Sequence, residues 1–344
     1  SHHGCTMTLS KERREELQKA AQTSTIFHLA FVGITNGLLD EMSSSAGVTA
    51  AGLAEAAGAD AGYTARWLDA AYAHELVDAE GDRFSLTELG EAFLTDAEGT
   101  LMPMAVGSIL GPHMAERAAA CTRTGEQPGE QVLAERETVL PWFGPMLEAR
   151  FGPFFEEVIL EGVPEFKEVD ASEGIAVDLG CGNGWYLRKL AATFPHLRGI
   201  GLDGIEQNIE QATELAERDG VGDRLTFQTG DIFDFTVDEP VDLIAMNRAL
   251  HHVWHDRDRV FEALRDHLKS GGVAVIWEPN YPAEREKLRD PGRRMFAMQN
   301  LSEHVQGNHL LAPSEVEEAF EEHRMSAQTY LFRDGNEAVI VGRR

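Results

Sequence analysis

The sequence predicts an α/β fold, in which a doubly wound domain with a mostly parallel sheet follows a mainly helical domain. Two observations carry this prediction. From residue 174 onward, short aliphatic runs alternate with longer segments of helical periodicity, the pattern of successive β-α-β units. Before that point helical periodicity dominates, and one hairpin interrupts it. The 344 residues suffice for two domains of roughly 150 residues each.

The first domain is expected to span residues 1–99 and to be mainly helical. Apolar residues recur at helical spacing through residues 10–41, and shorter helices are expected near residues 48–58 and 63–71. A hairpin is expected over residues 76–86, because two short strand-like runs flank a Glu-Gly-Asp turn. Two helices followed by a hairpin form the winged-helix pattern, which often binds DNA.

The charge of the chain argues against nucleic acid as a partner. It carries 30 Lys and Arg residues against 58 Asp and Glu residues, a formal net charge of −28. Between residues 42 and 100 the basic residues are Arg66 and Arg83, against eleven acidic residues. A phosphate-binding surface needs the opposite sign, and anionic membranes are disfavoured on the same ground. We therefore expect the winged-helix-like domain to form a homodimer or to cover the substrate.

The cysteine content and the hydropathy indicate a cytoplasmic protein. Cys5, Cys121 and Cys181 form neither a CxxC motif nor a disulfide framework, which fits a reducing compartment. No run approaches about 18 apolar residues, so we expect no transmembrane helix. We also expect no secretory signal.

Residues 100–170 are expected to form a helical linker or lid. Prolines and glycines interrupt a stretch there whose aromatic residues are Trp142, Phe143, Phe151, Phe154 and Phe155. Aromatic side chains at this density usually belong to a core. A lid over an apolar substrate is the alternative.

The second domain is expected to span residues 171–344. Strands are expected at residues 175–179, 197–202, 225–229, 241–246, 272–277, 327–332 and 338–341, and helices at 186–194, 205–219, 257–268 and from 314 onward. In a doubly wound sheet, ligands bind at the carboxyl ends of the strands. The residues that follow each strand are therefore the candidate site residues.

A glycine-rich loop follows the first strand. Gly180, Gly182 and Gly184 have the spacing GxGxG, which differs from the GxGxxG of dinucleotide-binding proteins. Glycines allow a tight turn and a close approach of the backbone to a ligand. Asp178 precedes the loop, and a carboxylate at that position suits a cationic ligand better than a pyrophosphate.

Acidic residues follow the next two strands. Asp203 ends the second strand, 19 residues after Gly184, where a carboxylate accepts hydrogen bonds from both ribose hydroxyls. Asp231 follows the third strand and is placed to accept a hydrogen bond from an adenine amino group. The neighbouring residues Gly204, Ile232 and Asn247 complete the expected cofactor contacts.

With these motifs the chain resembles the class I S-adenosylmethionine-dependent methyltransferases, from residue 174 to the C-terminus. The resemblance implies a Rossmann-like domain whose glycine loop holds the methionine part of S-adenosylmethionine, with Asp203 on the ribose and Asp231 on the adenine. The helical module before it, over residues 49–94, resembles that of the small-molecule O-methyltransferases of natural-product pathways. A small-molecule acceptor in secondary metabolism and a homodimer are therefore expected.

Three histidines lie just after the fourth strand. They are His251, His252 and His255. In the O-methyltransferases a Leu-His-Asp-Trp sequence stands here, and its histidine removes the proton of the acceptor hydroxyl. The resemblance gives that role to His251. The chain departs from the pattern, because His252 replaces the Asp and Val253 precedes Trp254. A neutral imidazole is as competent a metal ligand as a base.

A later histidine favours the metal. His304 lies near the end of an expected helix, 53 residues after His251. The chain also resembles the α-keto acid C-methyltransferases, of which the phenylpyruvate enzyme is the type, and these hold a metal ion with two histidines from these regions. The resemblance implies a transition-metal ion, iron or zinc, on His251 and His304. An arginine is expected on the acceptor carboxylate, and Arg136 is the favoured residue, with Arg123 as the alternative.

The preferred hypothesis is therefore metal-assisted C-methylation of an α-keto acid at the carbon next to the ketone. Such an ion stabilises the negative charge that develops on the acceptor. His251, His252 and Arg136 are the expected catalytic residues. The first alternative is O- or N-methylation of a natural-product acceptor with His251 as general base. An S-adenosylmethionine-sensing protein without turnover is the alternative of another class.

Overall fold

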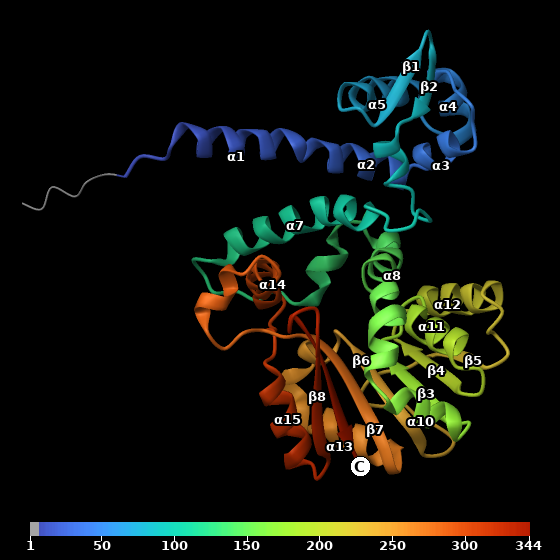
Figure 1. Ribbon diagram of the computed structural model, residues 1–344, viewed down its shortest axis with the longest axis vertical. Helices are drawn as coiled ribbons and strands as arrows, with labels where there is room; N and C mark the ends of the chain where they lie inside the picture. The colour runs from blue at the N-terminus through green and yellow to red at the C-terminus, as the bar shows by residue number, and fades with distance from the viewer. Residues whose placement is uncertain (1–6) are drawn as a thin grey trace, which may run out of the picture. The chain divides into compact units, whose positions relative to one another are not determined.

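The computed structural model describes residues 7–344, which form two compact units (Figure 1). Unit 1 comprises the described residues up to His113 together with Arg136–Ala149, and unit 2 comprises Met114–Glu135 and Arg150–Arg344. The segment 100–170, expected as a separate linker or lid, is divided between them. The reason is that helices α7 (Met102–Cys121) and α8 (Phe143–Phe154) each begin in unit 1 and end in unit 2.

Unit 1 contains the predicted succession of two helices and a hairpin. Its elements are α1 (Lys11–Thr23), α2 (Thr25–Thr35), α3 (Leu38–Ser43), α4 (Ala50–Ala57), α5 (Ala61–Ala73), β1 (Val77–Glu80), β2 (Arg83–Leu86) and α6 (Glu88–Glu91). Thr49 and Asp60 cap α4 and α5 by accepting hydrogen bonds from backbone N–H groups in the first turns. Leu53, Leu68 and Phe93 lie in its fully buried core.

Unit 2 is built on a seven-stranded sheet of order β5-β4-β3-β6-β7-β9-β8. The strands are β3 (Ile175–Leu179), β4 (Arg198–Asp203), β5 (Leu225–Thr229), β6 (Val241–Asn247), β7 (Leu268–Pro279), β8 (Ser326–Phe332) and β9 (Glu337–Arg343). Strands β3 to β7 pair in parallel, and β9 pairs antiparallel with both β7 and β8. The order turns back at β3 and β6, and this confirms the predicted doubly wound topology.

Helices cover both faces of this sheet (Figure 1). One core lies against α10 (Glu165–Ala171) and α11 (Trp185–Thr193), and the other against α13 (Arg257–His267) and α15 (Pro313–Glu322). The remaining helical segments of unit 2 include α9 (Leu160–Gly162), α12 (Glu206–Arg218), α14 (Arg294–Val305), η1 (Glu130–Glu135), η3 (Phe155–Ile159), η4 (Leu250–His252), η5 (Trp254–Asp256) and η6 (Arg285–Arg289). The sheet is thus enclosed except at its strand ends.

The aromatic residues predicted near position 150 belong to the core of unit 2. Phe155 is fully buried and stacks on Tyr186 with ring centroids 4.2 Å apart. Phe151 and Phe154 pack against Trp277 of β7. Core rather than lid is therefore the role of these three side chains. Within residues 7–344, the helices lack the combination of length and hydrophobicity that a membrane span requires.

A buried ion pair lies at the carboxyl edge of this sheet. Arg248 Nη1 donates to both carboxylate oxygens of Glu337, at 3.1 and 2.8 Å, and Trp277 Nε1 donates to Glu337 Oε2 at 3.0 Å. We expect Glu337→Gln to destabilise unit 2 by about 3 kcal/mol, because the buried guanidinium then lacks its counter-charge. Urea unfolding followed by tryptophan fluorescence measures this.

The exposed pair between Arg343 and Glu168 provides the matched control. Glu168→Gln removes the same charge from a solvated pair and is expected to cost less than about 1 kcal/mol. If the Glu337→Gln protein and the wild type unfold at the same urea concentration, the assignment of Glu337 as a buried counter-ion is contradicted.

Candidate active site

The glycine loop leaves β3 with its backbone in the left-handed region. Gly180, Gly182 and Gly184 have φ values of 77°, 54° and 78°. A Cβ atom at Gly184 would lie 2.8 Å from the ring of Phe227, so no other residue fits that turn. Open space surrounds the Cβ position of Gly182. The loop therefore presents bare backbone at the carboxyl edge, as the spacing predicts.

Asp203 at the end of β4 holds this loop in place. Its Oδ2 accepts the N–H of Gly182 at 3.0 Å, while its Oδ1 accepts from Ile205 N at 2.9 Å and Asn208 Nδ2 at 3.1 Å. The side chain is half-buried, so part of the carboxylate still faces the solvent side of the edge. Asp203 can therefore position the loop and accept hydrogen bonds from a ligand at the same time.

The buried Asp178 and the half-buried Asn247 form a polar pair between the loop and β6. Asn247 Nδ2 donates to Asp178 Oδ1 at 3.1 Å. Burial raises the pKa of Asp178 well above its ordinary value, despite that hydrogen bond. Asn247 Oδ1 is buried and has no hydrogen-bond partner. Such a buried acceptor without a partner is costly unless a hydrogen-bond donor of a ligand reaches it. A cationic donor at this place would also stabilise the charged form of Asp178.

The other predicted cofactor residues lie along the same edge. Asp231 follows β5, is exposed, and accepts the N–H of Phe233 at 2.7 Å. Gly204 is exposed and Ile232 half-buried. Because β5, β4, β3 and β6 are consecutive neighbours in the sheet, all the predicted cofactor residues line one continuous edge.

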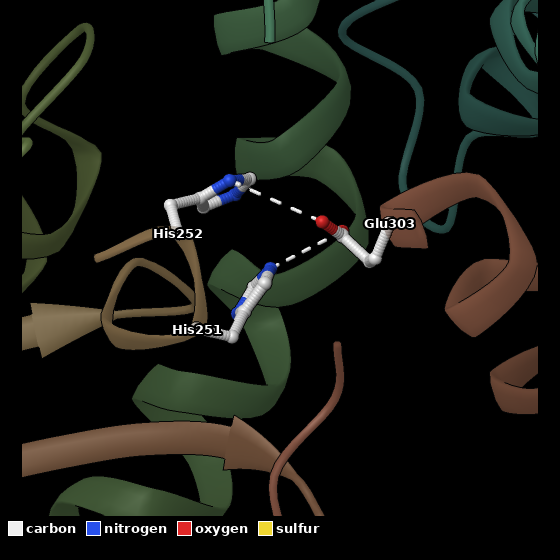
Figure 2. Close-up of side chains that lie close together, drawn as sticks. All are labelled: His251, His252 and Glu303. Carbon is white, nitrogen blue, oxygen red and sulfur yellow. Dashed lines mark hydrogen bonds and ion pairs between the residues drawn. The ribbon is translucent and has the colours of Figure 1, made fainter. Parts of the chain in front are cut away.

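His251 is buried between two carboxylates. Its Nδ1 lies 2.8 Å from Glu278 Oε2 of β7. Its Nε2 lies 3.2 Å from Glu303 Oε1 of α14, a contact drawn in Figure 2. The backbone N–H of His251 also donates to Glu278, at 3.2 Å. Burial opposes the charged imidazolium, but the two carboxylates outweigh it and raise the pKa of His251 to about 10. The two carboxylates therefore favour the charged form of His251.

His252 lies beside His251 and faces the same helix. Figure 2 shows both rings projecting from η4 toward Glu303. His252 Nδ1 lies 2.7 Å from Glu130 Oε1 of η1 and 4.0 Å from Glu303 Oε2, and Asn308 Nδ2 lies 3.1 Å from the same nitrogen. One donor atom each from His251, His252 and Glu303 lies within 4.8 Å of the other two. These three side chains could hold a metal ion.

The structure does not bring His304 into this set. His304 is exposed. Its carbonyl oxygen accepts a hydrogen bond from Gln127 Nε2, and the same Nε2 lies within hydrogen-bonding distance of its ring. Consecutive residues of a helix are rotated by about 100°, so Glu303 and His304 leave α14 in different directions. The prediction that His304 lies beside His251 was therefore wrong, and the residue of α14 that contacts His251 is Glu303.

The other predicted side chains lie outside the set. His255 is exposed on η5, and Arg123 is exposed as well. Arg136 belongs to unit 1, where its Nε donates to His113 Nδ1 at 3.2 Å. A role of Arg136 at the acceptor carboxylate has no support from this contact.

Sequence reasoning missed the three acidic partners of the histidines, Glu130, Glu278 and Glu303. Glu278 had a detectable signal, because it directly follows the strand predicted at residues 272–277, as Asp203 follows the strand predicted at residues 197–202. Glu303 and Glu130 had none, since the chain carries 58 acidic residues and most of them are solvated.

Comparison with known proteins identifies the central part of unit 2. Residues 176–272 match a family model described as a methyltransferase domain. A trans-aconitate 2-methyltransferase from Streptomyces coelicolor is 34% identical over 112 residues, which are 32% of this chain and 37% of that protein. The chain thus spans little more than a third of the length of this relative.

Solved structures resemble the chain over nearly its whole length. An O-methyltransferase family protein from Burkholderia thailandensis is 19% identical, with a TM-score of 0.69 over 98% of this chain and 99% of that one. Human N-acetylserotonin methyltransferase in complex with S-adenosylmethionine is 19% identical, with a TM-score of 0.66 over 98% and 99% of the two chains. These likenesses show a shared fold for both units.

Proposed function

We propose that this protein transfers a methyl group from S-adenosylmethionine to a small-molecule acceptor, because residues 176–272 match a methyltransferase-domain family model and lie in a doubly wound sheet. One observation carries the proposal. The glycine loop, Asp203 and Asp231 follow one another along the same edge of the sheet. When bound, S-adenosylmethionine supplies an electrophilic methyl group on a cationic sulfur.

The residues at this edge suit that ligand. Asp178 and the orphaned Oδ1 of Asn247 would accept the donors of a cationic amino group. Asp203 would accept the ribose hydroxyls, and Asp231 the adenine amino group. The backbone of Gly180 and Gly182 leaves room for the methionine part. What the chain contributes is alignment of donor and acceptor and exclusion of water.

The test is cofactor affinity after Asp203→Ala. We expect the Kd for S-adenosylmethionine to rise about 100-fold, roughly 2.7 kcal/mol, because ribose acceptors and the anchor of Gly182 are lost together. Isothermal titration calorimetry measures it. Asp223→Asn, a change of the same charge at an acid of unit 2 outside the strand-end edge, is the control. Unchanged affinity in a folded Asp203→Ala protein would refute the proposal.

For the acceptor atom we propose oxygen or nitrogen, with His251 as the general base. The support is the full-length likeness to a protein named as an O-methyltransferase family member and the Glu278 carboxylate, which fixes the imidazole through Nδ1. In this chemistry Nε2 must face the acceptor hydroxyl without its proton. Acceptor binding therefore has to displace Glu303, which lies 3.2 Å from that nitrogen.

A second candidate is metal-assisted C-methylation of an α-keto acid, favoured by the set of His251, His252 and Glu303. A metal ion there would stabilise negative charge on the acceptor. Glu278 would hold His251 from behind, as carboxylates commonly do for metal-binding histidines. Metal analysis of chelator-free protein carrying His2→Ala and His3→Ala tests this candidate. About one ion per chain, lost on Glu303→Ala, supports it, and its absence after adding iron or zinc rules it out.

We further propose that the protein acts as a homodimer through unit 1. Helix α1 buries none of its residues in the described chain, so a second copy has a free face to cover. Sedimentation velocity of the full chain against a variant lacking residues 1–23 tests this. A cytoplasmic location and an acceptor from secondary metabolism remain proposals that follow from the same resemblance.

A further inference from the structure

Three arginines of unit 2 gather at the carboxyl edge of β6, close to the histidines but separate from them. Arg248 directly follows β6 and precedes His251 by three residues, and its guanidinium lies over the ring of Phe151 with 4.3 Å to the centroid. Arg150 lies over the same ring, at 5.1 Å. Arg333, in the turn between β8 and β9, lies over the ring of Phe154 at 4.0 Å.

The charge of this cluster is compensated only in part by carboxylates of the described residues. Glu337 neutralises Arg248 through the buried ion pair described above. Within residues 7–344, neither Arg150 nor Arg333 forms an ion pair with a carboxylate. Each guanidinium group lies over the face of a phenylalanine ring, and Arg150 also contacts the Sδ of Met295 at 3.5 Å. Both side chains are exposed. Two guanidinium groups without a carboxylate ion pair are unexpected in a chain of net charge −28, where carboxylates are abundant.

The electrostatics of Arg150 agree with this placement. Desolvation by its neighbours, and then the charge of Arg248, lower the pKa of Arg150; Glu337 acts in the opposite direction, and Arg333 adds a smaller lowering contribution. Like charges held this close repel each other, and an anion placed between them would relieve the repulsion. The cluster is therefore poised for an anionic ligand rather than for solvent alone.

The backbone around the cluster is also unusual. Arg248 and Arg333 have φ values of 52° and 51°, in the left-handed region that residues with a side chain rarely adopt. Strain of this kind concentrates at functional sites. Arg293 donates to Asn336 Oδ1 at 2.9 Å and to Gly335 O at 3.3 Å, which fixes the turn that carries Arg333. The position of the Arg333 side chain is thus built into the fold.

Helix α14 connects this cluster with the histidine set. Met295, which contacts Arg150, and Glu303, which contacts His251, are eight residues apart on it. At 1.5 Å per residue the two positions are about 12 Å apart along the helix axis. Met295 and Met298 are exposed on this helix and offer apolar surface. This span matches a small organic molecule with a charged group at one end.

We propose that Arg150 and Arg333, with Arg248 behind them, form a subsite for an oxyanion carried by the methyl acceptor, remote from the atom that is methylated. The proposal rests on the proposed methyltransferase function. The acceptor is then an apolar molecule with a carboxylate or phosphate group. Arginine suits either group, because its planar guanidinium donates two parallel hydrogen bonds. The subsite would select anionic acceptors over neutral ones of equal shape.

The test is calorimetric titration of the full chain with phenylacetate, phenyl phosphate and neutral phenylacetamide, with and without S-adenosylmethionine. We expect both anions to bind at least tenfold more tightly than the amide. The double variant Arg150→Gln/Arg333→Gln is expected to lose this preference. Tighter binding of phenyl phosphate than of phenylacetate would assign the group as a phosphate, and the reverse as a carboxylate.

The matched control is Arg218→Gln/Arg259→Gln, which removes the same charge from exposed positions on α12 and α13. Equal anion affinity in the two double variants, or no preference over the amide in the wild type, would overturn the subsite. The Kd for S-adenosylmethionine, measured in the same samples, separates the two proposals. A wild-type protein that binds S-adenosylmethionine but shows no preference for anions over the amide refutes the subsite alone, and absent cofactor binding in the wild type refutes the proposed function.

Discussion

Replacement of His251 by alanine is expected to lower kcat about 10³-fold, a loss typical of a positioned acid-base group, while the Kd for S-adenosylmethionine stays within about twofold. The reason is spatial. The side chain of His251 contacts Glu278 and Glu303, and neither of these belongs to the glycine loop or to its anchor at Asp203. Release of S-adenosylhomocysteine, followed over a panel of phenols and α-keto acids, measures kcat.

The alanine variant leaves two buried carboxylates facing each other, so folding must be controlled. His251→Gln keeps an N–H donor for the carboxylates and is expected to show the same loss of kcat with better stability. His255→Ala, at an exposed histidine four residues away, should retain wild-type turnover. A folded His251→Gln protein with kcat near the wild type would remove His251 from the reaction, whichever atom accepts the methyl group.

The cofactor half of the site could be predicted from the sequence because its determinants are local. Each residue follows a strand, and the strand order of a doubly wound sheet brings successive strand ends to one edge. Gly184 illustrates why the residue type is informative, since its left-handed backbone and its contact with Phe227 exclude a side chain. Asp203 was expected for the ribose, but its hydrogen bond to Gly182 N, which anchors the loop, followed from no sequence pattern.

The histidine half could be predicted only in part, because its partners come from distant elements. The position of His251 after β6 was predicted, whereas its contact in α14 was placed at His304 instead of Glu303. A helix turns by about 100° per residue, so an error of one position changes the direction in which the side chain points. The periodicity of α14 did not fix which of the two neighbouring polar residues, Glu303 or His304, faces His251.

The arginine cluster shows a third kind of limit. Arg150, Arg248 and Arg333 lie on a helix, after a strand and in a hairpin turn. No spacing in the chain relates them, and the predicted carboxylate partner, Arg136, lies in unit 1. What unites the three is tertiary packing on Phe151 and Phe154 and the neighbourhood of Glu337. Such a cluster becomes visible only when the sheet order is known.

Glu303→Gln is expected to change turnover in opposite directions for the two candidate chemistries, by tenfold or more in each case. If His251 is the general base, the active form is the neutral imidazole. Glu278 and Glu303 raise the pKa of His251 to about 10, so the wild-type rate should increase as the pH rises toward that value. Removing one of the two negative charges lowers the pKa, and the variant should be faster than the wild type at pH 7.

If a metal ion is held by His251, His252 and Glu303, the same substitution removes an anionic ligand. Metal content and turnover should then fall together, by tenfold or more, and added iron or zinc should restore part of the rate. Glutamine preserves the size of the side chain, so neither result can be attributed to a lost volume. Glu315→Gln, at a half-exposed acid of the neighbouring helix α15, controls for a change of one charge. An acceleration at pH 7 with no bound metal would assign the base, and a loss rescued by metal would assign the ion. An unchanged rate and pH profile in the Glu303→Gln protein would count against both candidate chemistries. In each of them the Glu303 carboxylate beside Nε2 of His251 affects turnover, either through the pKa of His251 or as a metal ligand.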